Sequence, residues 1–110
     1  MTEITKGLFL GAIEHAQSLQ FLQQNNITTV ISFLHVPPAV TFEGISFHHF
    51  PLFDSVKGED PFVHFDKFSA ILDNVFAKNT DAVLVHCLRG VSRSATNVMA
   101  YIMERQHKRY

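Results

Sequence analysis

Hydrophobic positions along the chain follow two spacings, which predict alternating strands and helices. Residues 27–34, ITTVISFL, and residues 82–86, AVLVH, are short β-branched, apolar runs, which is typical of buried strands. Residues 12–26 and 61–78 place apolar side chains three and four positions apart, which predicts amphipathic helices. Elements that alternate in this way favour an α/β fold with a mainly parallel central sheet flanked by helices.

Glycine and proline indicate where the other elements begin and end. Two adjacent prolines, Pro37 and Pro38, predict a loop over residues 35–44. Asp60 is a suitable helix cap and Pro61 suits a first helical position, so the second helix is expected to start there. The remaining expected elements are a strand pair over residues 5–11, a strand over residues 45–53 that ends near its proline, and a helix over residues 91–109.

The composition is that of one globular domain over residues 1–110. Hydrophobic residues make up 46% of the 110 residues and include eleven Phe, which suffices for a single packed core. The net charge of −1 gives no general attraction to nucleic acid or to an anionic membrane. No apolar run approaches the ~20 residues of a membrane span. We therefore expect neither a nucleic-acid partner nor a membrane partner.

The only cysteine, Cys87, comes directly after the apolar run 82–86. A single cysteine cannot form an internal disulfide, which fits a reducing compartment and favours the cytoplasm, with a nuclear location left open. Open parallel sheets bind ligands beyond the carboxyl ends of their strands. Cys87 is therefore expected at the edge of the sheet where a binding site belongs.

The segment that follows Cys87, LRGVSRS, is suited to bind a tetrahedral anion. Gly90 permits a tight turn, and Ser92 and Ser94 suit the first turn of the helix that comes next. Backbone N–H groups at such a helix start converge on an anion, and the helix dipole supports them. Arg93 can add two parallel hydrogen bonds from its guanidinium group. The same field favours the thiolate form of the cysteine over the thiol.

Residues 86–94, HCLRGVSRS, resemble the signature of the cysteine-dependent protein phosphatases, which is His-Cys, five residues, Arg, and then Ser or Thr. The continuation SATNVMAYIM is similar to the dual-specificity branch of that family, as are ITKGLFLGAIEHA, NNITTVISF and FHHFPLFDS. The resemblance covers residues 4–105. It implies a phosphatase-like fold and an enzyme that hydrolyses phosphotyrosine, phosphoserine and phosphothreonine in proteins, without a cofactor.

The resemblance also implies a role for each residue of the motif. Cys87 is expected to be the nucleophile that forms a phosphocysteine, and Arg93 to bind the phosphoryl oxygens. Ser94 is expected to donate a hydrogen bond to the cysteine sulfur and ease its departure; the alternative is that its hydroxyl serves only the helix backbone. The expected phosphate-binding residues are Leu88, Arg89, Gly90, Val91, Ser92 and Arg93.

Other residues of the expected site leave alternatives open. Asp54 is expected to be the general acid, with Glu59 and Asp60 as rivals, of which Asp60 is better explained as a helix cap. His86 either helps to hold the thiolate through hydrogen bonds or is purely structural. Arg89 stands where the family commonly has a small residue, and it either adds charge at the pocket rim or is a solvent-exposed side chain.

The seven histidines do not predict a metal site. His48 and His49 are adjacent in an expected strand, so their side chains point to opposite faces and form a poor chelate. We expect no metal and no cofactor.

The expected partner is a phosphorylated protein. The alternatives are a phospho-binding module with little turnover and a phosphatase that acts on phosphoinositide or RNA 5′-phosphate. Family members usually continue after the AYIM helix with two further helices, whereas this sequence stops at ERQHKRY. We therefore expect a fold that lacks those last helices, an apolar patch left exposed, and either a homodimer or a marginally stable monomer.

Overall fold

The structure is a computed structural model that describes residues 2–51, 62, 64–78, 81–87 and 93–107, without the side chains of residues 93, 106 and 107. The strands are β1 (Thr2–Thr5), β2 (Leu8–Gly11), β3 (Ile27–Leu34), β4 (Ser46–Pro51) and β5 (Ala82–Cys87). The helices are α1 (Ile13–Ala16), α2 (Leu19–Gln24), α3 (Phe65–Ala77) and α4 (Arg93–His107). Strands and helices follow one another largely as the hydrophobic spacing predicts.

The five strands form one sheet in the order β1-β2-β5-β3-β4. β5 pairs in parallel with β2 and with β3, and β3 pairs in parallel with β4. Only β1 runs antiparallel, against β2, and the two are joined by a turn in which Gly7 has a φ of 83°. Glycine adopts this left-handed conformation without steric cost. The expected α/β fold with a mainly parallel sheet flanked by helices is confirmed.

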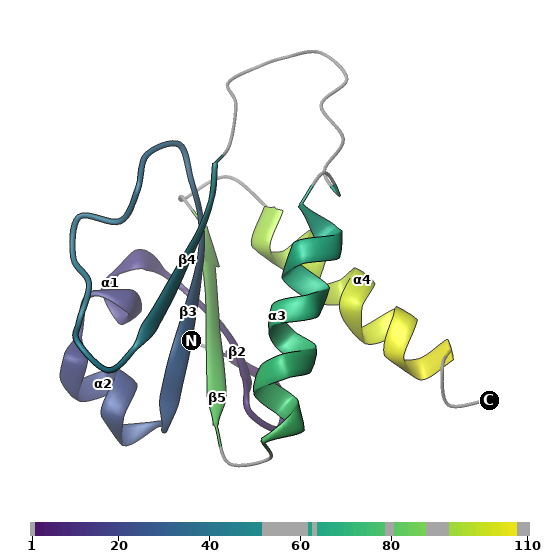
Figure 1. The fold of residues 1–110 in the computed structure, drawn as a ribbon, viewed down its shortest axis with the longest axis horizontal. Helices are drawn as coiled ribbons and strands as arrows, with labels where there is room; N and C mark the ends of the chain where they lie inside the picture. Colours follow the sequence, from purple (N-terminus) through teal and green to yellow (C-terminus); the bar gives the residue numbers. More distant parts are fainter. Residues whose placement is uncertain (1, 52–61, 63, 79–80, 88–92, 108–110) are drawn as a thin grey trace.

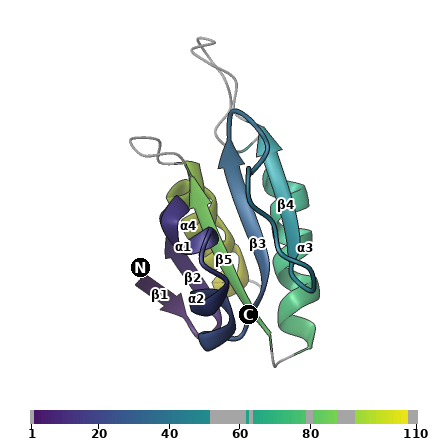
Figure 2. The same ribbon diagram turned by 90° about the vertical axis from the view of Figure 1, so that its left-hand side faces the viewer.

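Helices cover both faces of the sheet, as Figures 1 and 2 show: α1 and α2 lie on one face, and α3 and α4 on the other. Each face has its own buried core. The α3/α4 side contains Leu8, Ile31, Phe33, Phe50, Phe68, Leu72, Val75, Val83, Val85, Val98 and Tyr101. The α1/α2 side contains Phe9, Ala16, Leu22, Ile27, Val30, Ala82 and Leu84. Because side chains alternate along a strand, neighbours in β5 face different cores.

Two expectations about helix boundaries are wrong. The helix expected over residues 12–26 is two short helices, because Ser18 starts α2 by accepting a hydrogen bond from the Phe21 N–H at 3.3 Å. A serine that caps the backbone in this way competes with a continuous helix. The helix expected from Pro61 begins instead at Phe65, with His64 as its cap, while Asp60 and Pro61 lie outside the described residues.

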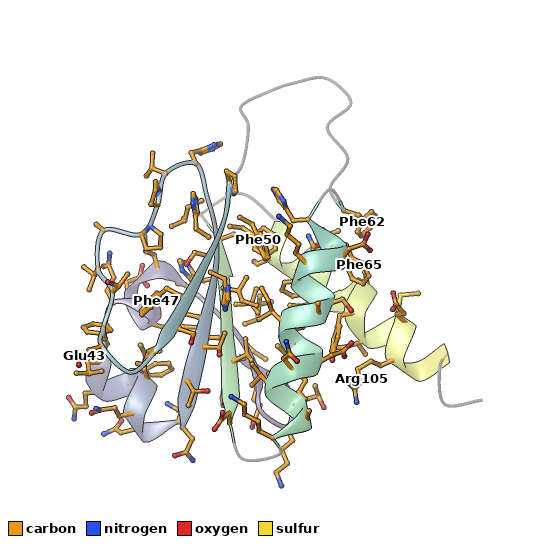
Figure 3. The ribbon with its side chains drawn as sticks, viewed as in Figure 1. Glu43, Phe47, Phe50, Phe62, Phe65 and Arg105 are labelled. Atoms are coloured by element: carbon orange, nitrogen blue, oxygen red, sulfur yellow. The ribbon has the colours of Figure 1, made fainter. Side chains whose placement is uncertain are left out.

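The His64 side chain, directly before α3, contacts the end of β4. Its Nε2 donates a hydrogen bond to the Pro51 carbonyl oxygen at 2.9 Å, and its ring stacks on Phe50, with centroids 5.1 Å apart. Phe50 also packs against Phe33 and Phe68 in the core (Figure 3). These contacts tie the end of β4 to the start of α3.

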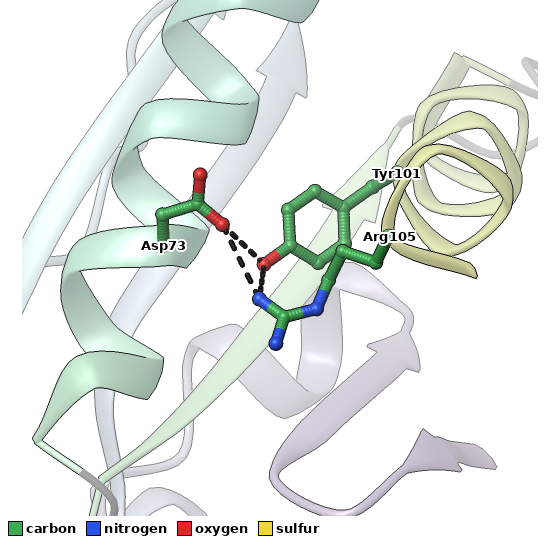
Figure 4. Close-up of polar contacts among 3 residues, drawn as sticks. All are labelled: Asp73, Tyr101 and Arg105. Atoms are coloured by element: carbon green, nitrogen blue, oxygen red, sulfur yellow. Dashed lines mark hydrogen bonds and ion pairs between the residues drawn. The ribbon is translucent and has the colours of Figure 1, made fainter. Parts of the chain in front are cut away.

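A three-residue polar cluster fastens α4 to α3 (Figure 4). The Tyr101 hydroxyl donates to Asp73 Oδ1 at 2.8 Å, and Arg105 donates to the Tyr101 oxygen at 2.8 Å and to Asp73 at 3.3 Å. Tyr101 is 2% exposed, and its ring also packs edge-on against Phe68. Burial, followed by the hydrogen bond to Asp73, raises the pKa of Tyr101 to about 12. The cluster holds in place the helix that begins with the last two residues of the phosphatase-like motif, Arg93 and Ser94.

Candidate functional site

The candidate site lies at the carboxyl end of β5. Cys87 is the last residue of β5, and Phe33 of β3 is its partner across the sheet. Ser94 is the second residue of α4 and is 3% exposed. The strand end and the helix start are therefore brought together, as expected for a ligand site in a parallel sheet.

Ser94 and Cys87 are in direct contact. The Ser94 hydroxyl donates a hydrogen bond to the Cys87 sulfur at 2.9 Å. The Cys87 side chain packs against the core on the α3/α4 side and is partly buried. A donated hydrogen bond stabilises negative charge on the atom that accepts it. The Ser94 hydroxyl can therefore stabilise negative charge on the Cys87 sulfur.

His86 points to the other face of the sheet and links two strands. Its Nε2 lies 2.6 Å from the Ser32 hydroxyl of β3, and the side chain is 1% exposed. Burial, assisted by the nearby His15, lowers the pKa of His86 to about 4. The imidazole is therefore neutral at pH 7, and any help that it gives to a thiolate cannot come from a positive charge.

The buried Nδ1 of His86 has no hydrogen-bond partner among the residues that the structure describes. The hydrogen bond between His86 Nε2 and the Ser32 hydroxyl links β5 to β3 at the residue directly before Cys87. Sequence reasoning did not name Ser32, although a signal was present. It is a polar residue inside the otherwise apolar end of ITTVISFL, and a buried hydroxyl requires a partner.

Several predicted site residues lie outside the described part of the chain. These are Asp54, Leu88, Arg89, Gly90, Val91 and Ser92. Arg93 is described only as the first residue of α4, without its side chain. The structure thus brings Cys87, Ser94 and the backbone of Arg93 to one end of the sheet, and the roles of the other residues stay predictions.

One of the two histidines of β4, His49, bonds to the neighbouring strand β3. His49 donates a hydrogen bond from Nε2 to the Leu34 carbonyl oxygen at 2.8 Å. Within the described ranges, no three His, Cys, Asp or Glu side chains gather in a way that could hold a metal ion.

None of the described helices has the length and apolar character needed to cross a membrane.

The chain is similar to known proteins over most of its length. Dual specificity protein phosphatase 22 of Xenopus laevis is 38% identical over 103 residues, which are 94% of this chain and 48% of that protein. The crystal structure of DUSP15 superimposes with a TM-score of 0.81 at 32% identity, covering 94% of this chain and 64% of the other. A human tyrosine phosphatase-like serine/threonine/tyrosine-interacting protein superimposes with a TM-score of 0.80 at 31% identity, covering 93% and 71%.

This chain spans about half the length of the Xenopus laevis relative. Residues 8–110 match the family described as "Dual specificity phosphatase, catalytic domain". The matched region contains the Cys87–Ser94 contact and nearly the whole sheet. On this match, and on the shared fold, the chain belongs to the dual specificity phosphatase catalytic domain family.

Proposed function

We propose that residues 1–110 form one catalytic domain that hydrolyses phosphotyrosine, phosphoserine and phosphothreonine in proteins through a phosphocysteine intermediate. The observation that carries the proposal is the 2.9 Å hydrogen bond from Ser94 to the Cys87 sulfur, at the junction of β5 and α4. Family membership and relatives named as protein phosphatases support the same activity. They do not favour the alternatives of phosphoinositide or RNA 5′-phosphate.

In the first proposed step, the Cys87 sulfur attacks phosphorus and the bond from phosphorus to the substrate oxygen breaks. Asp54 gives its proton to the departing oxygen, so that an alcohol or phenol leaves rather than its anion. Residues 88–92 and Arg93 bind the three phosphoryl oxygens and stabilise the charge that they carry in the transition state.

In the second step, the Asp54 carboxylate takes a proton from water while the water oxygen attacks phosphorus. The sulfur–phosphorus bond breaks, its electron pair returns to sulfur, and inorganic phosphate leaves. The Ser94 hydroxyl stabilises the negative sulfur as it departs, which is the step in which the hydrogen bond seen in the structure matters most.

The test is release of p-nitrophenol from p-nitrophenyl phosphate, inhibited by vanadate, with Cys87→Ser as the blank. Turnover that disappears in the variant supports the proposal, and turnover that persists contradicts it. A panel of phosphopeptides, phosphoinositides and 5′-triphosphate RNA then identifies the substrate class. Higher kcat/KM on the lipids or the RNA than on all phosphopeptides would overturn the assignment to proteins.

The second candidate function is a phospho-binding module. The observation in its favour is the similarity to a protein described as phosphatase-like and as interacting with serine, threonine and tyrosine. In this chain, Cys87, Arg93 and Asp54 are all present, which favours the enzyme. Tungstate binding without any p-nitrophenol release would establish the binding module instead.

We also propose a cytoplasmic location, which cell fractionation tests.

A further proposal is that the protein self-associates through α4. Met99 and Met103 lie one helical turn apart on α4 and are 62% and 60% exposed, so they present an apolar surface. Sedimentation of the wild type and of Met103→Lys measures the effect of this surface. A compact monomer for both proteins would contradict self-association.

A further inference from the structure

An apolar pocket lies beside the candidate site, on the face of the sheet that α1 covers. Its volume is about 190 Å³, and it lies between α1 and the segment that follows β3. Ile13 and Ala16 of α1 form one wall, residues 34–40 form the opposite wall, and the buried His86 contributes from the sheet. The pocket is thus built from three separate parts of the chain.

The pocket reaches the same end of β5 as the nucleophile position, from the other face of the sheet. His86, which lines it, directly precedes Cys87 in β5, and the two side chains point to opposite faces. Across the sheet, Phe33 is the partner of Cys87, and the following residue, Leu34, also lines the pocket. Consecutive Cα atoms are about 3.8 Å apart, and an extended peptide advances about 3.3 Å per residue. A peptide that crosses this end of the sheet, with its phosphate beyond the end of β5, can therefore place a side chain a few residues away in the pocket.

The lining favours an uncharged, apolar occupant. No Lys, Arg, Asp or Glu is among the described residues that line the pocket, and its polar side chains are Gln17, His35 and His86. The His86 imidazole is neutral at pH 7 because burial lowers its pKa to about 4. Val36 lines the pocket although it is 67% exposed, so an apolar surface faces solvent where a peptide would enter.

The size of the pocket suits one large side chain. An apolar cavity of about 150 Å³ is sufficient to hold a benzene molecule. The pocket here is somewhat larger, at about 190 Å³, so it can accept a leucine, methionine or phenylalanine side chain. A whole peptide segment would not fit, and a phosphate or carboxylate would lack a charged partner among the described lining residues.

We propose that this pocket binds one apolar side chain of the phosphorylated protein, at a fixed position within a few residues of the phosphorylated residue. The proposal rests on the phosphatase function proposed above and adds a substrate preference to it. The preference arises from burial of apolar surface between α1 and residues 34–40, which is separate from the binding of phosphate at the end of β5.

The test uses phosphotyrosine peptides that differ at a single position. Each position from three before to three after the phosphotyrosine is occupied in turn by Leu, Gly or Asp, and kcat/KM is measured with the full chain. Full burial of a leucine side chain predicts a preference for Leu over Gly of about 10-fold or more at one position. At the same position, Asp is expected to be disfavoured relative to Gly.

Two variants place a charge in the pocket. Val40→Asp and Ala39→Asp both change lining residues in a segment without regular secondary structure, and Ala39 is exposed, so its change is tolerated by the fold. Both are expected to reduce the ratio of the Leu-peptide rate to the Gly-peptide rate towards one. The matched control is Ile4→Asp, which changes an apolar residue that is 38% exposed in β1, outside the pocket, and should keep the wild-type ratio.

The outcomes separate this inference from the proposed activity. Turnover of p-nitrophenyl phosphate with no preference at any position would overturn the pocket assignment and leave the phosphatase intact. An undiminished preference in both pocket variants would also overturn the assignment. If turnover is absent altogether, anisotropy of labelled peptides with Cys87→Ser measures the same Leu-to-Gly ratio as a ratio of Kd values. A ratio near one would again refute the inference.

Discussion

Removal of the Tyr101 hydroxyl, in Tyr101→Phe, is predicted to destabilise the fold in a pH-dependent way. The change keeps the ring, which packs against Phe68 and Phe76, and deletes only the hydrogen bonds to Asp73 and Arg105. Hydrogen bonds to charged partners contribute about 1.5–3 kcal/mol. Because Asp73 and Arg105 are about half-exposed and regain water, we expect a loss of about 1–2 kcal/mol at pH 7.

The pH dependence follows from the raised pKa of Tyr101, which is about 12, whereas the ordinary value for tyrosine is 10.0. The folded protein holds the hydroxyl proton more tightly than the unfolded chain does. This contribution to stability is therefore fully present below pH 10 and is lost as the pH rises from 10 towards 12. At pH 11 the difference in unfolding free energy between wild type and variant should be smaller than at pH 7 by at most about 1.4 kcal/mol. Solvent screening makes this reduction smaller.

The assay is urea unfolding of both proteins at pH 7, 9 and 11, with the difference in unfolding free energy taken at each pH. Taking the difference cancels the titration of groups that are the same in both proteins. Arg105→Gln is the matched control, since it removes an exposed partner and should cost less than about 1 kcal/mol. A difference that stays constant from pH 7 to 11 would refute the reasoning about the Tyr101 environment.

Three further predictions concern the site. Asp54→Asn should lower kcat on p-nitrophenyl phosphate by about 10²–10⁴-fold, the range for general acids, and a change below about threefold would mean that another residue donates the proton. Ser94→Ala removes the hydroxyl that donates to the Cys87 sulfur, so the phosphocysteine should accumulate; rapid-quench measurement should show a burst, and an unchanged steady state without a burst would contradict the role. The lowered pKa of His86, about 4, means that the unfolded chain binds more protons than the folded protein between pH 4 and 6.5. Stability should therefore fall as the pH drops through that window, and His86→Gln should reduce the fall in acid unfolding curves; an equal fall in both proteins would exclude His86 as its source.

Features of the fold that depend on local sequence could be predicted. The strands β3 and β5 follow from short, largely apolar runs that are rich in β-branched residues, and Cys87 and Ser94, which are in contact, are only seven residues apart in one motif. The boundaries of two helices were predicted wrongly. Ser18 caps α2 in the middle of a continuous helical pattern, and His64 is engaged by Pro51 and Phe50.

Contacts between distant residues were beyond the reach of sequence reasoning. Tyr101 and Asp73 are separated by 28 positions, and Ser32 and His86 by 54, so nothing in either local pattern identifies the partner. The pocket between α1 and residues 34–40 has the same origin, because its walls come from segments joined only by the fold. The sequence can show that a buried serine or tyrosine requires a partner, but only the packing of the elements selects it.

The contact of His64 with Pro51 and Phe50 has a consequence for how this domain can diverge. It joins the two ends of the segment 52–63, which includes Asp54, without using any residue between them. When the ends of a segment are already held, doubling its length costs only about 0.6 kcal/mol of closure entropy. A longer segment between these two ends should therefore cost the fold little, so that the length of this connection can change, by evolution or by design, while the sheet and α3 are conserved.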